Sequence, residues 1–132
     1  MRLFCYGTLQ FPVILHEVAG VWLTGEPAVL DDYACYVVRG EVFPGIYPQP
    51  GATTSGVVYN GLGVVHLQKL DVFEGDIYER RRVCVSNAAG DPLQTWTYVV
   101  AAQHRHRLTR ETWNREEFEM EHLQHFVRRR LG

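Results

Sequence analysis

Long apolar runs are absent from the sequence. No stretch of about 18 uninterrupted apolar residues occurs, which is the length that a membrane-spanning helix needs. The N-terminal residues Met1 to Phe4 also lack the apolar stretch and cleavage site of a secretory signal peptide. We therefore expect a cytoplasmic protein with no membrane partner.

An excess of charge of one sign is also lacking. The chain has 13 Lys and Arg residues against 15 Asp and Glu residues, a formal net charge of −2. Proteins that bind nucleic acid through its phosphates carry a strongly basic face, so we expect no nucleic-acid partner. We identify two basic clusters, Arg80–Arg82 and Arg128–Arg130, and interpret both as solvated surface.

Cysteine is scarce. The three cysteines, Cys5, Cys35 and Cys84, are widely spaced, and an odd number without paired spacing is a poor disulfide framework. Cys5 and Cys84 lie in apolar runs that are typical of strands. We expect both to be buried thiols with a structural role.

Histidine pairs occur without the third ligand that a metal site needs. His104 and His106 form one pair, and His122 and His125 form another. Neither pair has a further ligand at a recognised spacing. We therefore expect no metal site.

The residues that are present are sufficient for one compact domain, residues 1–132, in which 46% of the side chains are hydrophobic. Short β-branched or aromatic runs predict strands. These runs are Leu3–Tyr6, Val18–Leu23, Ala34–Val38, Thr53–Tyr59, Arg82–Val85 and Gln94–Val100, the last two forming a hairpin. Pro and Gly are dense between Arg39 and Gly51, which predicts irregular structure there.

Two main helices are predicted, over Leu62–Glu74 and Arg115–Arg130. The second begins after the N-cap residue Asn114, and Trp113 and Phe118 are spaced to pack together across its first turn. Its apolar stripe, which we expect to be buried on the sheet, consists of Met120, Leu123, Val127 and Leu131. Because helices and strands do not alternate regularly, we predict an α+β fold with a small, curved or barrel-like mixed sheet.

One carboxylate lies on the apolar side of the first predicted helix. At about 100° per residue, Glu74 falls on the same side as Leu67 and Leu70. It also lies in the last turn, just before Gly75, where the helix dipole disfavours a negative charge. Burial and the dipole both raise the pKa of a carboxyl group, which suits general acid/base catalysis near neutral pH. The alternative is a side chain that reaches solvent at a frayed helix end.

A tight loop follows the first predicted strand. It consists of Tyr6, Gly7, Thr8 and Leu9. Gly7 allows a turn where a side chain would clash, and successive N–H groups in such a turn can bind an anion or a developing oxyanion. An ordinary strand-to-loop turn is the alternative interpretation.

Further polar residues flank the candidate acid. Tyr78 follows Glu74 by four residues, so it either hydrogen-bonds that carboxyl group or is an ordinary half-buried tyrosine. Asp71 and Asp76 lie around the same turn. We interpret them as surface or capping residues.

Taken together in order, these segments resemble the γ-glutamylcyclotransferase superfamily. The matching blocks are Tyr6-Gly7-Thr8-Leu9, Phe43-Pro44-Gly45-Ile46, Gly56-Val57-Val58-Tyr59, Leu70-Asp71-Val72-Phe73-Glu74-Gly75 and Tyr78-Glu79-Arg80. Their order and spacing are similar to the AIG2-like branch, which includes γ-glutamylamine cyclotransferases. The blocks span roughly Leu3 to Val85, and the segment from Asn87 onward departs from the pattern.

The resemblance implies a small barrel-like α+β fold, no cofactor and the release of 5-oxoproline from a γ-glutamyl amine or peptide. It implies that Glu74 is the catalytic acid/base and that Tyr6, Gly7, Thr8 and Leu9 line the glutamyl pocket. We also expect Tyr78 to be a substrate-binding residue. We expect a small-molecule γ-glutamyl substrate and a monomer or weak homodimer. The alternative is an AIG2-like module that binds a small molecule without turnover, although such a module would be expected to lose the carboxylate at position 74.

Overall fold

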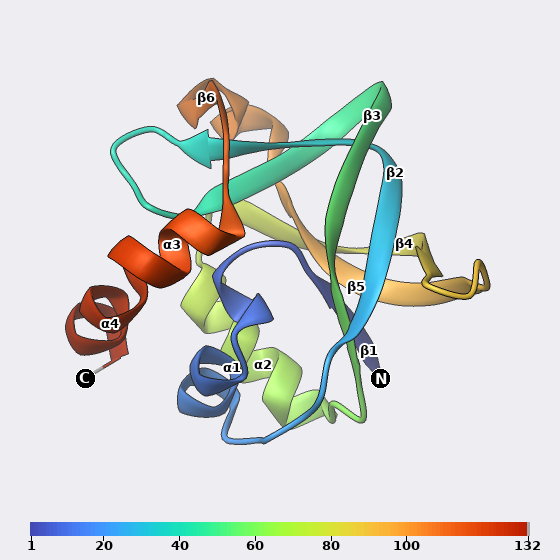
Figure 1. Ribbon diagram of the computed structural model, residues 1–132, viewed down its shortest axis with the longest axis horizontal. Coiled ribbons are helices and arrows are strands. Elements are labelled where there is room, and N and C mark those ends of the chain that lie inside the picture. Colours follow the sequence, from blue (N-terminus) through green and yellow to red (C-terminus); the bar gives the residue numbers. More distant parts are fainter. Residues whose placement is uncertain (132) are drawn as a thin grey trace.

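The computed structural model describes residues 1–131, which form a mixed α+β fold (Figure 1). The strands are β1 (Arg2–Cys5), β2 (Glu26–Val38), β3 (Pro44–Asn60), β4 (Tyr78–Asn87), β5 (Pro92–Val100) and β6 (Leu108–Thr112). The α-helices are α1 (Pro12–Ala19), α2 (Val64–Glu74), α3 (Arg115–Glu121) and α4 (Leu123–Phe126). Short 3₁₀ segments cover Thr8–Gln10 (η1) and Ala102–Arg107 (η2), and Val127–Leu131 (η3) is a π-helical turn.

The strands close into a barrel-like sheet, which confirms the predicted fold class. Their order is β3-β1-β5-β4-β2, and β2 pairs again with β3, while β6 extends the edge of β2. β1 is antiparallel to β3 and parallel to β5, so the sheet is mixed. The long pairing of β2 with β3 shifts register between Asp31 and Tyr33, and the intervening Asp32 has a positive φ of 65°. A bulge of this kind bends a hairpin, and so helps it to close a small barrel.

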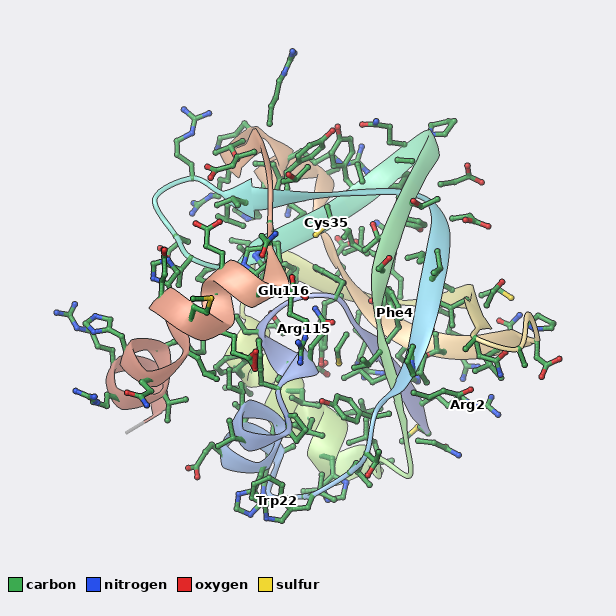
Figure 2. The ribbon with its side chains drawn as sticks, viewed as in Figure 1. Arg2, Phe4, Trp22, Cys35, Arg115 and Glu116 are labelled. Atoms are coloured by element: carbon green, nitrogen blue, oxygen red, sulfur yellow. The ribbon has the colours of Figure 1, made fainter. Side chains whose placement is uncertain are left out.

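Two cores lie on either side of β1. Inside the barrel, Phe4 and Tyr6 pack with residues of the other strands, among them Leu30, Ile46, Val58, Val85 and Val99 (Figure 2 shows Phe4). On the outer side, Leu3 and Cys5 pack with helical residues, among them Leu15, Leu67, Leu70, Phe118 and Phe126. Alternation of side chains along a strand explains this division. The C-terminal end of β1 is therefore the point at which barrel and helices meet.

The prediction of a strand over Val18–Leu23 is wrong, because α1 occupies Pro12–Ala19 and residues 20–25 form no regular element. Pro12 stands at the start of this helix, where its missing N–H costs nothing. Gly20 ends the helix in the left-handed conformation, with φ of 79°. The β-branched residues Val18 and Val21 therefore straddle a helix end.

The predicted irregular segment between Arg39 and Gly51 is also wrong over most of its length, because β3 begins at Pro44. Pro44 pairs with Val37, and Pro48 pairs with Tyr33. In this half of β3, the described strands provide a pairing partner on one side only, namely β2. Proline is tolerated in such an edge segment because its missing N–H breaks no ladder. The strand β6 was not predicted.

The C-terminal helix forms where predicted, but it is broken and buries a different stripe. Asn114 accepts a hydrogen bond from the Glu117 N–H at 2.8 Å, and the Trp113 and Phe118 rings lie 5.6 Å apart, as the capping pattern predicts. The helix then breaks at His122 between α3 and α4. Phe118 and Phe126 are buried, whereas Met120, expected in the core, is 86% exposed. Leu123 and Val127 pack against the outer core, and the side chain of Leu131 lies outside the described part.

The cysteines differ in burial. Cys5 is buried as predicted, but Cys84 is exposed. Cys84 alternates with the buried Val83 and Val85 along β4, so it faces outward. No helix in residues 1–131 is long and apolar enough to cross a membrane.

Candidate active site

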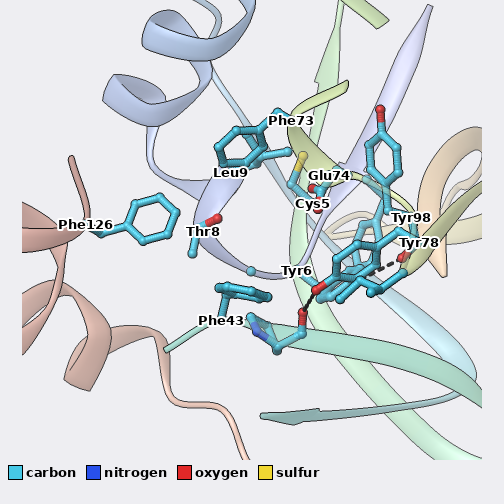
Figure 3. Close-up of a pocket in the computed structure, with 14 residues that line it drawn as sticks. Cys5, Tyr6, Thr8, Leu9, Phe43, Phe73, Glu74, Tyr78, Tyr98 and Phe126 are labelled. Carbon is cyan, nitrogen blue, oxygen red and sulfur yellow. Dashed lines mark hydrogen bonds between the residues drawn. The ribbon is translucent and has the colours of Figure 1, made fainter. Parts of the chain in front are cut away.

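A pocket opens where the end of β1 meets the end of α2 (Figure 3). Its empty volume, part of which is open to solvent, is about 560 Å³. The polar part of its wall includes Tyr6, Gly7, Thr8, Glu74, Tyr78 and Tyr98, and the apolar part includes Leu9, Phe43, Pro44, Phe73, Ile77 and Phe126. The structure therefore brings all six residues singled out in the sequence, namely Glu74, Tyr6, Gly7, Thr8, Leu9 and Tyr78, into one cavity.

Glu74 is the last residue of α2 and is half-buried in the pocket wall (Figure 3). Leu67 and Leu70 are buried on the same helix, as the helical spacing predicts. The Glu74 carboxylate lies close enough to Cys5 to affect its titration. Burial, and secondarily the charge of Glu74, raises the pKa of the Cys5 thiol. A thiol in that state is protonated, so Cys5 is not a thiolate nucleophile.

The loop after β1 is held in place through its carbonyl groups. Gln10 donates from Nε2 to the Tyr6 carbonyl at 2.7 Å, and the Gln10 N–H donates to the Gly7 carbonyl at 3.1 Å. The Tyr59 hydroxyl lies 2.8 Å from the Leu9 carbonyl and 2.9 Å from that of Gln10. These bonds fix the loop from its inner side.

The N–H groups of this loop are in a different situation. Among residues 1–131, the backbone N–H groups of Gly7, Thr8 and Leu9 form no hydrogen bond to another residue. All three residues line the pocket. Because buried N–H groups strongly favour an acceptor, the loop has donors available for an anionic or carbonyl oxygen of a bound molecule.

Gly7 is needed because of a close approach and not because of a positive φ. Its φ is −121°, which other residues adopt. A Cβ atom at this position would lie 2.9 Å from Cγ and Cδ of the Pro44 ring. Such a contact forces the loop or Pro44 to move. A side chain at position 7 would therefore clash, as predicted, and the group that it would meet is the Pro44 ring.

Tyr78 also contacts Pro44. Its hydroxyl donates to the Pro44 carbonyl at 2.6 Å (Figure 3). The ring of Tyr78 is half-buried in the same pocket wall that contains Glu74. Tyr78 therefore helps to hold Pro44 against Gly7.

Asp71 is more than the surface or capping residue that we expected. Arg80 binds its carboxylate with Nε at 2.8 Å and a terminal nitrogen at 3.2 Å, and the Tyr98 hydroxyl donates to it at 2.7 Å. Burial pushes the pKa of Asp71 upward, but these hydrogen bonds and the Arg80 charge outweigh it and hold the pKa below its usual value. Arg80 is accordingly not simply solvated. Asp76 is exposed, as expected.

Apart from Leu9, the residues of the apolar wall are not among the predicted site residues. Phe43 and Phe73 could have been noticed, because each directly precedes a residue of the matching blocks that lines the pocket, Pro44 and Glu74. Phe126 carries no such signal, since it reaches the pocket only through the packing of α4.

The described residues contain one group of three side chains that could hold a metal ion, Glu117, Glu121 and His122, whose ligand atoms all lie within 4.8 Å of one another. Both glutamates are exposed, and none of the three lines the pocket described above. Exposed acidic groups of this kind are common without a metal, and we assign no metal to them.

Comparison with known proteins gives the family. The model of the family described as gamma-glutamyl cyclotransferase, AIG2-like, matches residues 3–115. AIG2-like protein D of Arabidopsis thaliana is 32% identical over 127 residues, which cover 95% of this chain and 83% of that protein. A solution structure of another Arabidopsis thaliana protein is 28% identical and superposes with a TM-score of 0.76, over 96% of this chain and 77% of that one.

A solved structure named gamma-glutamyl cyclotransferase matches with a TM-score of 0.68 over 76% of this chain and 66% of that chain. At 19% identity, this match shows a common fold alone. The family match covers the loop after β1, α2 and the start of β4 together. The chain belongs to the AIG2-like γ-glutamylcyclotransferase family.

Proposed function

We propose that this protein cyclises the γ-glutamyl group of a γ-glutamyl amine or peptide to 5-oxoproline and releases the free amine. The observation that carries the proposal is the joint position of Glu74 and the partner-free N–H groups of Gly7, Thr8 and Leu9 on one pocket. The first is a group that can take and return a proton, and the second are donors for an oxyanion.

The nucleophile is part of the substrate. The α-amino nitrogen of the glutamyl group attacks its own γ-carbonyl carbon, so a C–N bond forms and a five-membered ring closes. Because the two reacting atoms are tethered, proximity contributes without any enzyme nucleophile. The pocket needs only to hold the γ-glutamyl group of the substrate in a folded conformation, to stabilise the developing charge and to transfer protons.

Glu74 is assigned the proton transfers. Its carboxylate accepts a proton from the α-ammonium group, which frees the lone pair for attack on the carbonyl carbon. When the tetrahedral intermediate collapses, Glu74 returns this proton to the leaving nitrogen as the original amide C–N bond breaks. The ring nitrogen loses a second proton, which ends on the released amine as an ammonium group. No water is consumed.

The loop after β1 is assigned to the charge that develops on oxygen. The negative oxygen of the intermediate needs donors that are already oriented, and the N–H groups of Gly7, Thr8 and Leu9 are fixed by the carbonyl bonds described above. The apolar side chains Phe43, Phe73 and Phe126 surround this region. They exclude water, which strengthens each of these hydrogen bonds.

The test is an assay of 5-oxoproline release from a panel of γ-glutamyl amines and γ-glutamyl amino acids. The expected result is 5-oxoproline and free amine in equal amounts. The matched control is the same substrate with its α-amino group acetylated, which is expected to give no product because it lacks the nucleophile. Release of glutamate would contradict the proposal, because it indicates attack by water. Binding of the substrates without turnover would support the alternative of a small-molecule-binding module.

A further inference from the structure

The strands β2, β3 and β6 come together at one end of the sheet (Figure 1). A groove lies there, apart from the candidate active site. It is lined by Tyr36, Tyr47, Gln49, Arg105, Leu108, Thr109 and Arg110. None of these residues lines the candidate active site. The groove is therefore a separate candidate binding site.

Basic side chains gather around this groove. The segment His104–Arg110 carries five basic residues, three arginines and two histidines, and no acidic one, and so forms a third basic cluster besides Arg80–Arg82 and Arg128–Arg130. The backbone N–H of Arg39 donates to the Arg107 carbonyl at 2.7 Å, which places the backbone of Arg39 beside this segment, while Arg105 and Arg110 are the arginines that line the groove. Within the described part of the chain, no carboxylate forms a salt bridge with Arg39, Arg105, Arg107 or Arg110.

The nearest acidic residues in the sequence face elsewhere. Glu41 and Glu111 line a different groove, beside Trp113. Although the whole chain has a net charge of −2, this groove is locally positive.

The floor of the groove is aromatic. Tyr36 pairs with Gly45 across the β2–β3 ladder, and Tyr47 follows Gly45 by two residues, so both tyrosines share one face. Their ring centroids lie 6.2 Å apart with an interplanar angle of 33°. The Arg105 guanidinium lies 5.8 Å from the centroid of the Tyr47 ring.

Gln49 adds an oriented donor. The Tyr47 hydroxyl donates to Gln49 Oε1 at 2.8 Å, so the carbonyl side of this amide is occupied and its NH₂ group remains for a ligand. The Thr109 hydroxyl donates to the Val37 carbonyl at 2.8 Å, so its proton is not available to a ligand. The donors that line the groove thus include two guanidinium groups, one amide and the Tyr36 hydroxyl, with no carboxylate among the lining residues.

We propose that this groove binds a small anion that carries a flat ring, with nucleoside diphosphates as the ligand class. Guanidinium groups bind phosphate oxygens in pairs of hydrogen bonds. Tyrosine rings provide a surface on which a nucleobase stacks. A monocarboxylate would use one arginine and would leave the aromatic floor uncovered, so it fits the groove less well.

The proposal is tested by titration calorimetry with three probes at low ionic strength: ADP, inorganic pyrophosphate and adenosine. ADP is expected to bind more tightly than either of the other two, because only ADP joins the phosphates to the ring. The double substitution Arg105→Ala/Arg110→Ala is expected to weaken ADP binding by about tenfold or more. Tyr47→Leu is expected to weaken the binding of ADP but not that of pyrophosphate.

Arg129→Ala is the control, because it removes one exposed positive charge from another part of the molecule. It should leave ADP binding unchanged, and circular dichroism should show that all variants are folded. Equal affinity for ADP in the parent and the Arg105/Arg110 variant would overturn the proposal. Binding of single-stranded RNA without binding of ADP would overturn the nucleotide assignment. Binding of pyrophosphate as tightly as ADP would also overturn it. Because every readout is binding, the outcome does not depend on cyclotransferase activity.

Discussion

Tyr98 donates a hydrogen bond from its hydroxyl to the Asp71 carboxylate at 2.7 Å, and so ties β5 to α2 one turn before Glu74. The backbone carbonyl of the same tyrosine accepts a hydrogen bond from the Tyr6 hydroxyl at 2.6 Å. One residue therefore contacts both the helix that carries the proposed acid and the loop that carries the proposed oxyanion donors. The Arg80 guanidinium closes this arrangement from β4.

Asp71→Asn tests whether this arrangement positions Glu74. The substitution keeps the shape of the side chain but removes the charge that Arg80 and Tyr98 bind. We expect the free energy of unfolding to fall by about 1 kcal/mol, at the low end for such bonds because the Asp71 side chain is 39% exposed. We also expect kcat for 5-oxoproline release to fall more than KM changes, because Glu74 would be displaced and the loop would not.

Asp76→Asn is the matched control for Asp71→Asn. Asp76 is exposed on the same turn, and its substitution makes the same change in net charge. It should leave both the unfolding free energy and kcat within error of the parent. If the two variants behave alike, Asp71 has no positioning role.

The pKa of Asp71 predicts how stability depends on pH. Because the pKa of this carboxyl is lower in the folded chain than in the unfolded chain, its contribution is fully present above the unfolded value of about 3.9. The contribution is lost as pH falls through the folded pKa, where the carboxyl becomes protonated. Urea unfolding of the parent and of Asp71→Asn should therefore give different free energies near neutral pH and converging ones in strong acid. A constant difference at all pH values would contradict this account.

The sequence predicts the parts of the site that depend on local patterns. Helix α2 and the placement of Glu74 follow from the spacing of Leu67 and Leu70 and from Gly75 at the helix end. By contrast, Tyr98 and Asp71 are 27 residues apart, and they meet only because β4 and β5 return beside α2. No local pattern encodes such a pair.

The two wrong secondary-structure predictions have the same kind of cause. Proline and glycine normally interrupt strands. Pro44 and Pro48 are nevertheless accepted in β3, because this half of β3 pairs with β2 on one side only. Val18 and Val21 favour a strand by propensity, but the helix signals of Pro12 and Gly20 decide the structure. Tertiary pairing and end signals therefore outweigh residue propensity at these positions.

Glu74→Gln tests the proposed acid/base. Glutamine has the same size and can still form hydrogen bonds, but it cannot carry a proton between two nitrogens. We expect kcat to fall by about 10²–10⁴-fold with folding retained, as judged by circular dichroism. Glu119→Gln, an exposed glutamate on α3, is the control and should be fully active. Near-normal 5-oxoproline release by Glu74→Gln would end the assignment.

Gly7→Val tests the contact between the loop and Pro44. A Cβ at residue 7 would lie 2.9 Å from the Pro44 ring, so the loop must shift and its N–H groups must leave their positions. We expect a rise in KM and a fall in kcat of about tenfold or more, because both substrate binding and oxyanion stabilisation depend on these donors. Gly63→Ala is the control: its φ is −94°, and its new Cβ would lie an ordinary 3.7 Å from His66. Steady-state kinetics on both variants checks this, and unchanged constants in Gly7→Val would show that the loop takes no part in the reaction.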